Sequence, residues 1–198
     1  MVYRFFQADD EMFSYAVERL DGDLNKVGPV DVTQDDGAVI REYNTVAGRA
    51  IDPSHLPTKV EIKGPKRGIT DVYLAGGTLV DEKFRSIVEA LEPGVHQFFA
   101  VDLLWSDGSS AGSRYWFFVC NRLDTVDREK TTKNFRNLWS NRGDGEFIFN
   151  RGQIGGHHIW VDKFTTPFMG ILMSNEMHDA LVEAGITGIG SNFFEETD

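Results

Sequence analysis

Residues 168–194 read Phe168-Met-Gly-Ile-Leu-Met-Ser-Asn-Glu-Met-His-Asp-Ala-Leu-Val-Glu-Ala-Gly-Ile-Thr-Gly-Ile-Gly-Ser-Asn-Phe-Phe194, and this stretch decides the expected fold. The apolar run 168–173 predicts a strand, and Ser174 is a typical N-cap for the helix that follows it. That helix is predicted because apolar residues recur along one helix face, at Met177, Ala180, Leu181 and Ala184. Gly185 ends the helix, and residues 189–194 form a second strand. The stretch therefore predicts a strand–helix–strand unit.

A similar pattern occurs earlier in the chain. Residues 71–75 predict a strand, residues 78–81 have the spacing of a helix capping box, and an apolar stripe follows at Phe84, Ile87, Val88 and Leu91. Pro93-Gly94 stops this helix, and residues 95–105 resume as a strand. The two stripes lie 93 residues apart, whereas residues 88–90 match 182–184 at an offset of 94 and residues 98–99 match 193–194 at 95. Two similar units explain this likeness, and so does local physics shared by any two such segments.

Two long apolar runs, residues 95–105 and 114–122, are joined by the Gly/Ser-rich loop 106–113 and predict a β-hairpin. The second run has an unbroken aromatic centre, Tyr115-Trp-Phe-Phe-Val-Cys120, which indicates that both of its faces are covered. Residues 2–7 predict an opening strand, residues 11–20 fit a helix or a strand, and residues 21–57 predict long loops with one or two brief strands. We therefore expect an α+β fold: a single compact domain with a mixed or antiparallel sheet, long N-terminal loops and two or three helices.

The 198 residues contain 20 Lys and Arg against 31 Asp and Glu, a net charge of -11 that is unevenly placed. Residues 1–36 and 174–198 each have a net charge of -6, so the remainder is almost neutral and includes basic stretches at 63–67 and 128–142. This pattern argues against direct nucleic-acid binding, whereas acidic ends either suit a basic partner or simply keep the protein soluble. The predicted partner-binding residues are all acidic: Asp9, Asp10, Glu11, Asp21, Asp23, Asp35, Asp36, Glu195 and Glu196.

The densest candidate for chemistry is the stretch His157-His158-Ile-Trp-Val-Asp162. Adjacent histidines on a strand point to opposite faces, so His158, Trp160 and Asp162 would share one face. A metal-dependent hydrolase or nucleotide-modifying enzyme around His158 and Asp162 is the alternative function, although no other histidine has a metal-ligand spacing. Gly-x-Ser-x-Gly and Walker motifs are not found in the sequence, which therefore predicts no catalytic residue, no metal ligand and no cofactor.

Residues 128–142 contain Phe135 and Trp139 among their basic residues, a pattern that also occurs in nucleic-acid-binding stripes. Phe135, Leu138 and Trp139 fit one face of an amphipathic helix as well, and this is the favoured interpretation. The lone cysteine, Cys120, lies in an apolar strand, where a thiol acts as a small hydrophobic group. No apolar run is long enough to span a membrane and the opening residues lack a signal-peptide layout, so we expect a cytoplasmic protein.

Three stretches carry a resemblance to a known family: Tyr115-Trp-Phe-Phe-Val-Cys-Asn-Arg-Leu-Asp-Thr-Val-Asp127, Gly155-Gly-His-His-Ile-Trp-Val-Asp-Lys163, and residues 171–188. They are similar to the eleventh immunity-protein family of bacterial polymorphic toxin systems, formerly a domain of unknown function. Residues 171–188 are the most specific of the three, and together with residues 80–101 the resemblance covers about residues 71–194. The chain departs from the family at residues 189–192, where the family usually has an arginine and a phenylalanine after the closing glycine.

The resemblance implies an immunity protein, or antitoxin, that binds a cognate secreted bacterial toxin and neutralises it by direct occlusion without catalysis. It also implies one immunity-type domain over residues 1–198, with a variable N-terminal strand and loops at residues 1–70 and a family-like core at residues 71–198. The expected partner is a toxin of a contact-dependent or type VI secretion system with a basic surface, and a nuclease is the natural candidate. An acidic scaffold that binds a basic cellular protein is a further alternative, and the sequence leaves the oligomeric state open.

Overall fold

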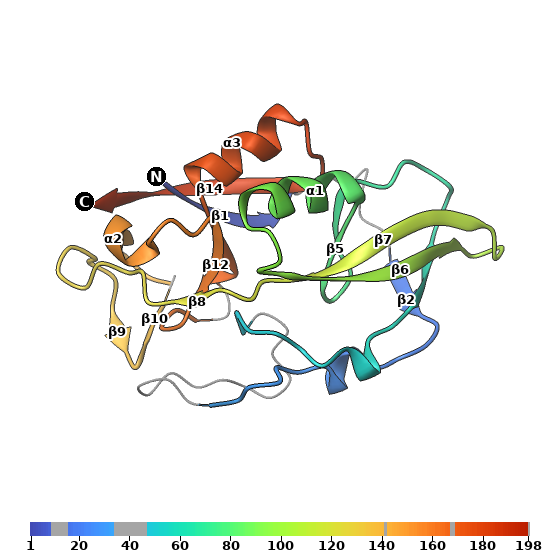
Figure 1. Ribbon diagram of the computed structural model, residues 1–198, viewed down its shortest axis with the longest axis horizontal. Coiled ribbons are helices and arrows are strands. Elements are labelled where there is room, and N and C mark those ends of the chain that lie inside the picture. Colours follow the sequence, from blue (N-terminus) through green and yellow to red (C-terminus); the bar gives the residue numbers. More distant parts are fainter. Residues whose placement is uncertain (9–15, 34–46, 141, 167–168, 198) are drawn as a thin grey trace.

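The computed structural model describes residues 1–8, 16–33, 47–140, 142–166 and 169–197 (Figure 1). Its helices are α1 (Glu82–Leu91), α2 (Arg151–Ile154) and α3 (Asn175–Glu183), with short 3-10 helices η2 (Leu24–Lys26) and η3 (Pro53–His55). The strands of the first sheet, in spatial order, are β2 (Ala16–Arg19), β3 (Lys59–Lys63), β6 (Gln97–Trp105), β7 (Ser110–Phe118), β5 (Thr78–Val80) and β4 (Val72–Leu74).

The second sheet has the order β11 (Ile148–Asn150), β14 (Ile189–Thr197), β1 (Val2–Gln7), β13 (Ile171–Ser174), β12 (Ile159–Asp162) and β8 (Arg122–Leu123). A separate two-stranded piece consists of β9 (Phe135–Arg136) and β10 (Leu138–Trp139). Both large sheets mix parallel and antiparallel neighbours. The predicted α+β fold is therefore confirmed, with most of its regular structure in the sheets.

Each sheet contains one strand–helix–strand unit. In the first sheet, β5 and β6 lie on either side of β7 and antiparallel to it, and α1 connects them. In the second sheet, β13 and β14 flank β1 in the same way, and α3 connects them. Of the two explanations that the sequence left open, the structure therefore agrees with two similar units, each with an antiparallel strand inserted between its two parallel strands.

The strand registers show which residues of the two units are equivalent. One phenylalanine of each middle strand faces a residue on either side: Phe117 faces Thr78 and Phe98, and Phe5 faces Ile171 and Ser191. The facing residues of the two units are 93 positions apart in both cases, which is also the offset of the apolar helix stripes. The sequence matches at offsets of 94 and 95 are wrong as alignments, because they lie one or two residues out of this register.

The helices α1 and α3 begin in the same way. The Asp81 carboxylate accepts a hydrogen bond from the backbone N–H of Phe84 (2.8 Å), and the Ser174 hydroxyl accepts one from the backbone N–H of Met177 (3.1 Å). These bonds satisfy donors that the first turn of a helix leaves unpaired. The N-cap predicted at Ser174 is confirmed, whereas the capping box predicted over residues 78–81 is wrong. Residues 78–80 are paired in β5 instead, and Asp81 is itself the cap.

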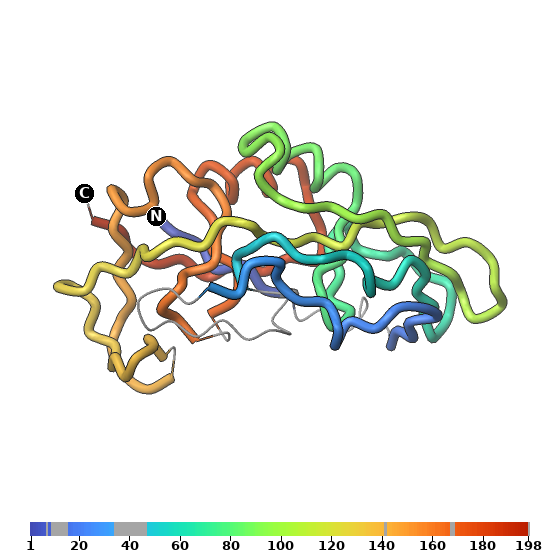
Figure 2. Tube along the Cα trace, turned by 60° about the horizontal axis from the view of Figure 1, so that its bottom comes forward, coloured from blue at the N-terminus to red at the C-terminus, as the bar shows by residue number. Residues whose placement is uncertain are grey.

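The inner apolar cluster packs α1 and α3 against both sheets through Phe84, Val88, Met177 and Leu181. The two helices lie side by side, and the segment that contains η2 and η3 lies on the opposite side of the sheets (Figures 1 and 2). This arrangement places one shared core between two similar units, so neither unit buries its helix alone.

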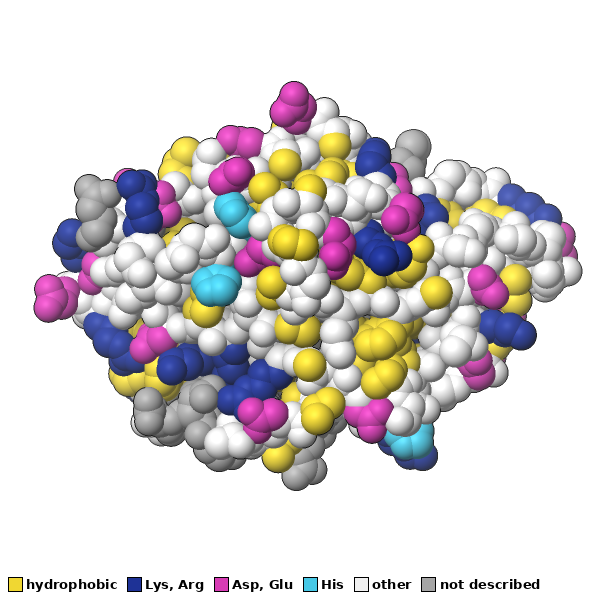
Figure 3. Space-filling view, in the orientation of Figure 1, with side chains coloured by type: hydrophobic (Ala, Val, Ile, Leu, Met, Phe, Trp, Pro, Cys, Tyr) yellow, Lys and Arg dark blue, Asp and Glu magenta, His cyan; other side chains and the backbone are white. Residues whose placement is uncertain are grey.

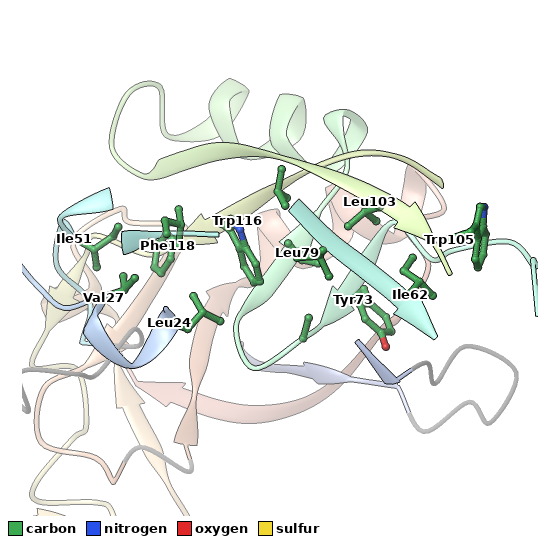
Figure 4. Close-up of a cluster of buried hydrophobic side chains, with 14 residues drawn as sticks. Leu24, Val27, Ile51, Ile62, Tyr73, Leu79, Leu103, Trp105, Trp116 and Phe118 are labelled. Carbon is green, nitrogen blue, oxygen red and sulfur yellow. The ribbon is translucent and has the colours of Figure 1, made fainter. Parts of the chain in front are cut away.

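Each sheet also has an outer apolar cluster. Leu24, Val27 and Ile51 cover the outer face of the first sheet beside Trp116 and Phe118 (Figure 4). Because Phe117 belongs to the inner cluster, the aromatic centre of β7 is covered on both faces, as predicted. The outer face of the second sheet is covered by residues between 126 and 169, including Trp139 and Phe164.

Three predicted elements need correction. Residues 135–139 form β9 and β10 and not the favoured helix, because the backbone of Trp139 pairs with Phe164 and Thr166 and the chain turns at Asn137 with a φ of 67°. Segment 11–20, for which the sequence fits a helix or a strand, is a strand over residues 16–19, and residues 11–15 lie outside the described part. The hairpin loop is shorter than predicted and spans only residues 106–109, since β7 already pairs with β6 from Ser110 onward.

Candidate partner-binding surface

The predicted acidic residues do not form one surface in the part of the chain that the structure describes. Asp21 and Asp23 lie between β2 and η2 at the first sheet, whereas Glu195 and Glu196 lie on β14 of the second sheet. The other predicted partner-binding residues fall outside the described ranges: Asp9, Asp10, Glu11, Asp35 and Asp36. The four described residues therefore belong to two separate parts of the surface, one at each sheet.

Asp21 and Asp23 are used by the fold. The Asp21 carboxylate accepts hydrogen bonds from the backbone N–H groups of Thr58 (2.8 Å) and Lys59 (3.0 Å) and from the Thr58 hydroxyl, which fixes the start of β3. Burial works to raise the pKa of Asp21, but these hydrogen bonds outweigh it and hold the pKa below its ordinary value. The Asp23 carboxylate caps η2 by accepting a hydrogen bond from the backbone N–H of Asn25 (3.0 Å).

Glu195 and Glu196 are neighbours with different environments. The Glu196 carboxylate accepts hydrogen bonds from the amino group of Met1 (2.7 Å) and from the guanidinium of Arg151 (2.7 Å). Burial works to raise the pKa of Glu196, but these two cationic groups lower it below its ordinary value. Glu195 is exposed, and its side chain makes no hydrogen bond or ion pair with any described residue. Of this pair, Glu195 is therefore the one that offers a carboxylate to a partner.

A larger acidic surface lies on the two long helices. Acidic side chains spread over α1 and α3 in Figure 3, and the exposed ones are Glu82, Glu176, Asp179 and Glu183. Three of them follow one another at helical spacing on α3, on the side away from the buried Met177 and Leu181. The charge count over residues 174–198 included these residues, but the predicted set omitted them. Their spacing opposite the apolar stripe was the signal that would have identified this face.

The candidate enzyme site around His158 and Asp162 has structural partners throughout. The Asp162 carboxylate is 1% exposed and accepts hydrogen bonds from the backbone and hydroxyl of Thr125 (2.7 and 2.9 Å) and from the backbone of Phe164 (2.9 Å). Burial raises the pKa of Asp162 above its ordinary value, although these bonds oppose the shift. Trp160 donates from its indole N–H to Thr125 Oγ1 (3.1 Å), and His158 Nδ1 lies 3.0 Å from the Ser174 hydroxyl.

These contacts join β12 to the loop after β8 and to the N-cap of α3, so the segment 157–162 connects elements of the second sheet. Among the residues that the structure describes, no group of three or more His, Cys, Asp or Glu side chains is arranged to hold a metal ion.

Glu92 is a buried carboxylate that was not predicted from the sequence. Its side chain accepts hydrogen bonds from His96 Nε2 (2.8 Å), from the Asn121 amide (2.9 Å) and from the backbone N–H of Ile159 (3.0 Å). His96 Nδ1 accepts a hydrogen bond from the backbone N–H of Cys120 (3.1 Å), so its proton is on Nε2 and points to Glu92. Glu92 follows α1 of the first unit and Ile159 begins β12 of the second sheet, so the carboxylate joins the two halves.

The pKa of Glu92 reports this environment. Burial works to raise it, but the hydrogen bonds from His96 and from the backbone N–H groups of His158 and Ile159 outweigh burial and hold the pKa below its ordinary value of 4.5. In the sequence, Glu92 stands beside Pro93-Gly94 and looks like part of a helix stop. No local spacing relates it to residues almost seventy positions further along.

Comparison with protein-family models gives a match to the immunity protein family (Imm11) over residues 16–194. The chain belongs to this family. The match covers the three stretches that carried the resemblance, extends it toward the N-terminus as far as residue 16, and leaves β1 outside. No curated protein matches the chain.

Membership in the Imm11 family makes the chain an immunity protein and gives it a cognate toxin as partner. Among the described residues of this immunity protein, no helix is long and apolar enough to cross a membrane. The exposed surfaces of the described residues include the acidic face of α1 and α3 and the end of β14 with Glu195. The buried polar groups around Asp162 and Glu92 hold the fold together.

Proposed function

We propose that this Imm11 protein neutralises its cognate toxin by binding it directly and occluding its active cleft, without a chemical step of its own. The observation that carries the proposal is the family match over residues 16–194. The hydrogen-bond partners of His158, Trp160 and Asp162 support it, because the residues of the competing enzyme hypothesis are used to join elements of the second sheet. Toxin delivery by contact-dependent or type VI secretion, and action of the immunity protein in the cytoplasm, belong to the same proposal.

The charge of the protein supports a toxin with a basic surface. The net charge is -11, and the exposed acidic residues of α1 and α3 leave that charge accessible to solvent. A negative field accelerates the approach of a positively charged protein and weakens as salt is added. Nucleases carry positive charge where they hold the phosphate backbone, so a nuclease is the toxin class that fits this field.

The test uses the toxin domain encoded beside the immunity gene. Both proteins are purified, mixed at increasing ratios and analysed by size-exclusion chromatography and by a fluorescence assay of nucleic-acid cleavage. We expect a stable complex and loss of toxin activity in proportion to the immunity protein added, with inhibition complete at a fixed stoichiometry. Inhibition at amounts far below that stoichiometry would indicate catalytic inactivation and would refute occlusion. A stable complex that still cleaves its substrate at full rate would also refute it.

A further inference from the structure

A basic segment projects from this acidic protein. We call residues 128–140 the basic tongue: it contains β9 and β10, four Lys or Arg residues and one Glu. Its anchor is Trp139, which is 5% exposed and pairs through its backbone with Phe164 (2.6 Å) and Thr166 (2.9 Å). Figure 3 shows Lys and Arg side chains gathered over the region of β8 to β10. The tongue is therefore a positively charged segment on a protein of negative net charge, and it is fixed to the outer face of the second sheet.

Aromatic rings hold the cations of this region in place. The Arg128 guanidinium lies over the rings of Phe135 (5.6 Å to the centroid) and Phe164 (4.7 Å), and the Lys163 ammonium lies 5.2 Å from the Phe164 centroid. Phe135 packs against Trp139 at 4.9 Å and remains 44% exposed. Cation–π contacts of this kind restrict long side chains before any partner arrives, so less conformational entropy is lost on binding.

The side chains of Lys130 and Arg136 are exposed at the same place, and neither side chain makes a hydrogen bond or ion pair with a described residue. Close to Lys130 lies the carboxylate of Asp127, which accepts a hydrogen bond from the Lys130 backbone N–H (3.0 Å) and whose pKa the Lys130 charge helps to lower. The Arg128 guanidinium forms an ion pair with one carboxylate, that of Asp124 (3.1 Å), and the Arg128 side chain is 44% exposed. Aromatic residues and arginine are enriched in protein–protein interfaces, and the tongue presents an exposed phenylalanine next to two arginines. A partner that binds here would have to supply the carboxylates that pair with these cations.

We infer that the basic tongue, through Arg128, Lys130, Phe135 and Arg136, is a docking surface for an acidic segment of the cognate toxin. This inference rests on the proposed function, because it assumes that the toxin binds directly. A protein segment fits better than a nucleic acid, since a polyphosphate would be repelled by the net charge of -11 and would meet few cations in return. The inference agrees with a toxin of basic net charge: net charge acts during approach, over distances up to the Debye length of about 8 Å, whereas the tongue acts at contact.

The experiment measures the affinity of the purified toxin domain for variants with matched controls. Lys130→Glu, Arg136→Glu and Phe135→Ala change exposed tongue residues. Arg67→Glu is the charge control, because Arg67 is exposed and unpaired among the described residues, and Phe193→Ala is the aromatic control, because Phe193 is 65% exposed. Thermal unfolding of each variant confirms that the fold is retained. The three tongue substitutions should each weaken binding at least about tenfold, and the controls less than about threefold.

The outcomes separate the two proposals. Tongue variants that bind as tightly as the controls would overturn the docking surface and leave direct neutralisation intact. A wild-type protein that fails to bind the toxin would overturn the proposed function, and the docking surface with it. Labelled 20-nucleotide single-stranded and duplex DNA are tested in parallel. Binding of either DNA by the wild type, with loss in Arg136→Glu, would assign the tongue to nucleic acid and overturn docking of an acidic protein segment.

Discussion

The first and second sheets share one strand–helix–strand unit but obtain the middle strand from different parts of the chain. In the first sheet the middle strand is β7, which follows β6 after a four-residue loop, residues 106–109. In the second sheet the same position is occupied by β1, from the opposite end of the chain. The registers make Tyr3-Arg-Phe-Phe6 equivalent to Tyr115-Trp-Phe-Phe118, so three of the four residue types agree.

This difference shows that the second unit is complete only when the two ends of the chain meet. Val2 pairs with both Ser174 and Phe194, and the amino group of Met1 bonds Glu196 on β14. A short connection from the end of β14 to the start of β1 would reproduce the hairpin of β6 and β7. The N-terminal strand therefore has the role of the last strand of its unit.

The largest effect is expected from deletion of residues 1–7. This change removes β1 from the middle of the second sheet, together with Val2 and Phe5, which are 0% and 5% exposed. The loss exceeds the net stability of a typical domain, about 5–15 kcal/mol, so the truncated chain should show no cooperative unfolding transition by circular dichroism in urea.

The matched variant is a circular permutant in which residues 1–7 follow residue 197 through a Gly/Ser linker of about four residues, the usual length of a hairpin connection. It should unfold cooperatively, because β14 and β1 are antiparallel neighbours. A truncated chain as stable as the wild type, or a permutant that fails to fold, would show that the equivalence of β1 and β7 is wrong.

The next largest effect on stability is expected at Glu92, which joins the first unit to β12 of the second sheet. Glu92→Gln keeps the shape of the side chain but replaces one of two carboxylate oxygens, both of which accept hydrogen bonds in a buried site. The free energy of unfolding should fall by about 2 kcal/mol, since a buried donor loses its partner. Glu183→Gln, at an exposed position on α3, is the control and should leave the free energy of unfolding within about 0.5 kcal/mol of the wild type.

The same carboxylate gives a pH dependence. Because the pKa of Glu92 is below its ordinary value of 4.5 in the folded state, the unfolded chain binds more protons as the pH falls below 4.5. Its contribution is therefore complete above pH 4.5 and is lost as the pH falls through the lowered pKa. The difference in stability between wild type and Glu92→Gln should shrink over that range. A difference that stays constant down to the lowest pH at which both fold would mean that Glu92 does not stabilise the fold as a carboxylate.

The sequence predicted what depends on local pattern. The apolar stripes and Ser174 identified α3, and the long aromatic runs identified the hairpin, because helix faces and strand pairs are coded over a few residues. The position of β1 depends on pairing with residues about 170 to 190 positions away, which no local pattern indicates. Residues 135–139 had the spacing of a helix face but pair with the backbone near Phe164. Tertiary hydrogen bonds decided that segment.

The site was predicted less well for the same reason. Charge could be counted from the sequence, but whether a carboxylate is free depends on distant donors such as the amino group of Met1 beside Glu196 or the backbone of Thr58 beside Asp21. The acidic face of α1 and α3 could have been found, since its residues alternate with an apolar stripe. The Glu92 cluster could not, because it joins three segments with no common local pattern.

A smaller effect is expected at the two helix N-caps. Asp81→Ala and Ser174→Ala each remove a side-chain acceptor for a backbone N–H of the first turn, at equivalent positions of the two units. Each should lower the free energy of unfolding by about 1 kcal/mol, measured by urea denaturation. Since the two caps lie on different helices and share no hydrogen-bond partner, the two losses should add in the double variant. A loss confined to one cap would show that the two units contribute unequally in spite of their common topology.

The smallest effect on stability, and the one that bears on function, is expected from Glu183→Lys combined with Glu195→Lys. Both residues are exposed and unpaired among the described residues, so the free energy of unfolding should change by less than about 0.5 kcal/mol. The change reduces the negative field, and the association rate with a basic toxin should fall about threefold or more at low salt, with little change in the dissociation rate.

Asp21→Lys is a poor probe of steering, because it also removes the bonds that fix β3. Stopped-flow association at several salt concentrations measures the effect. An unchanged rate with the same salt dependence would mean that the toxin is not steered by charge, and the basic-toxin proposal would then be wrong although the family function would stand.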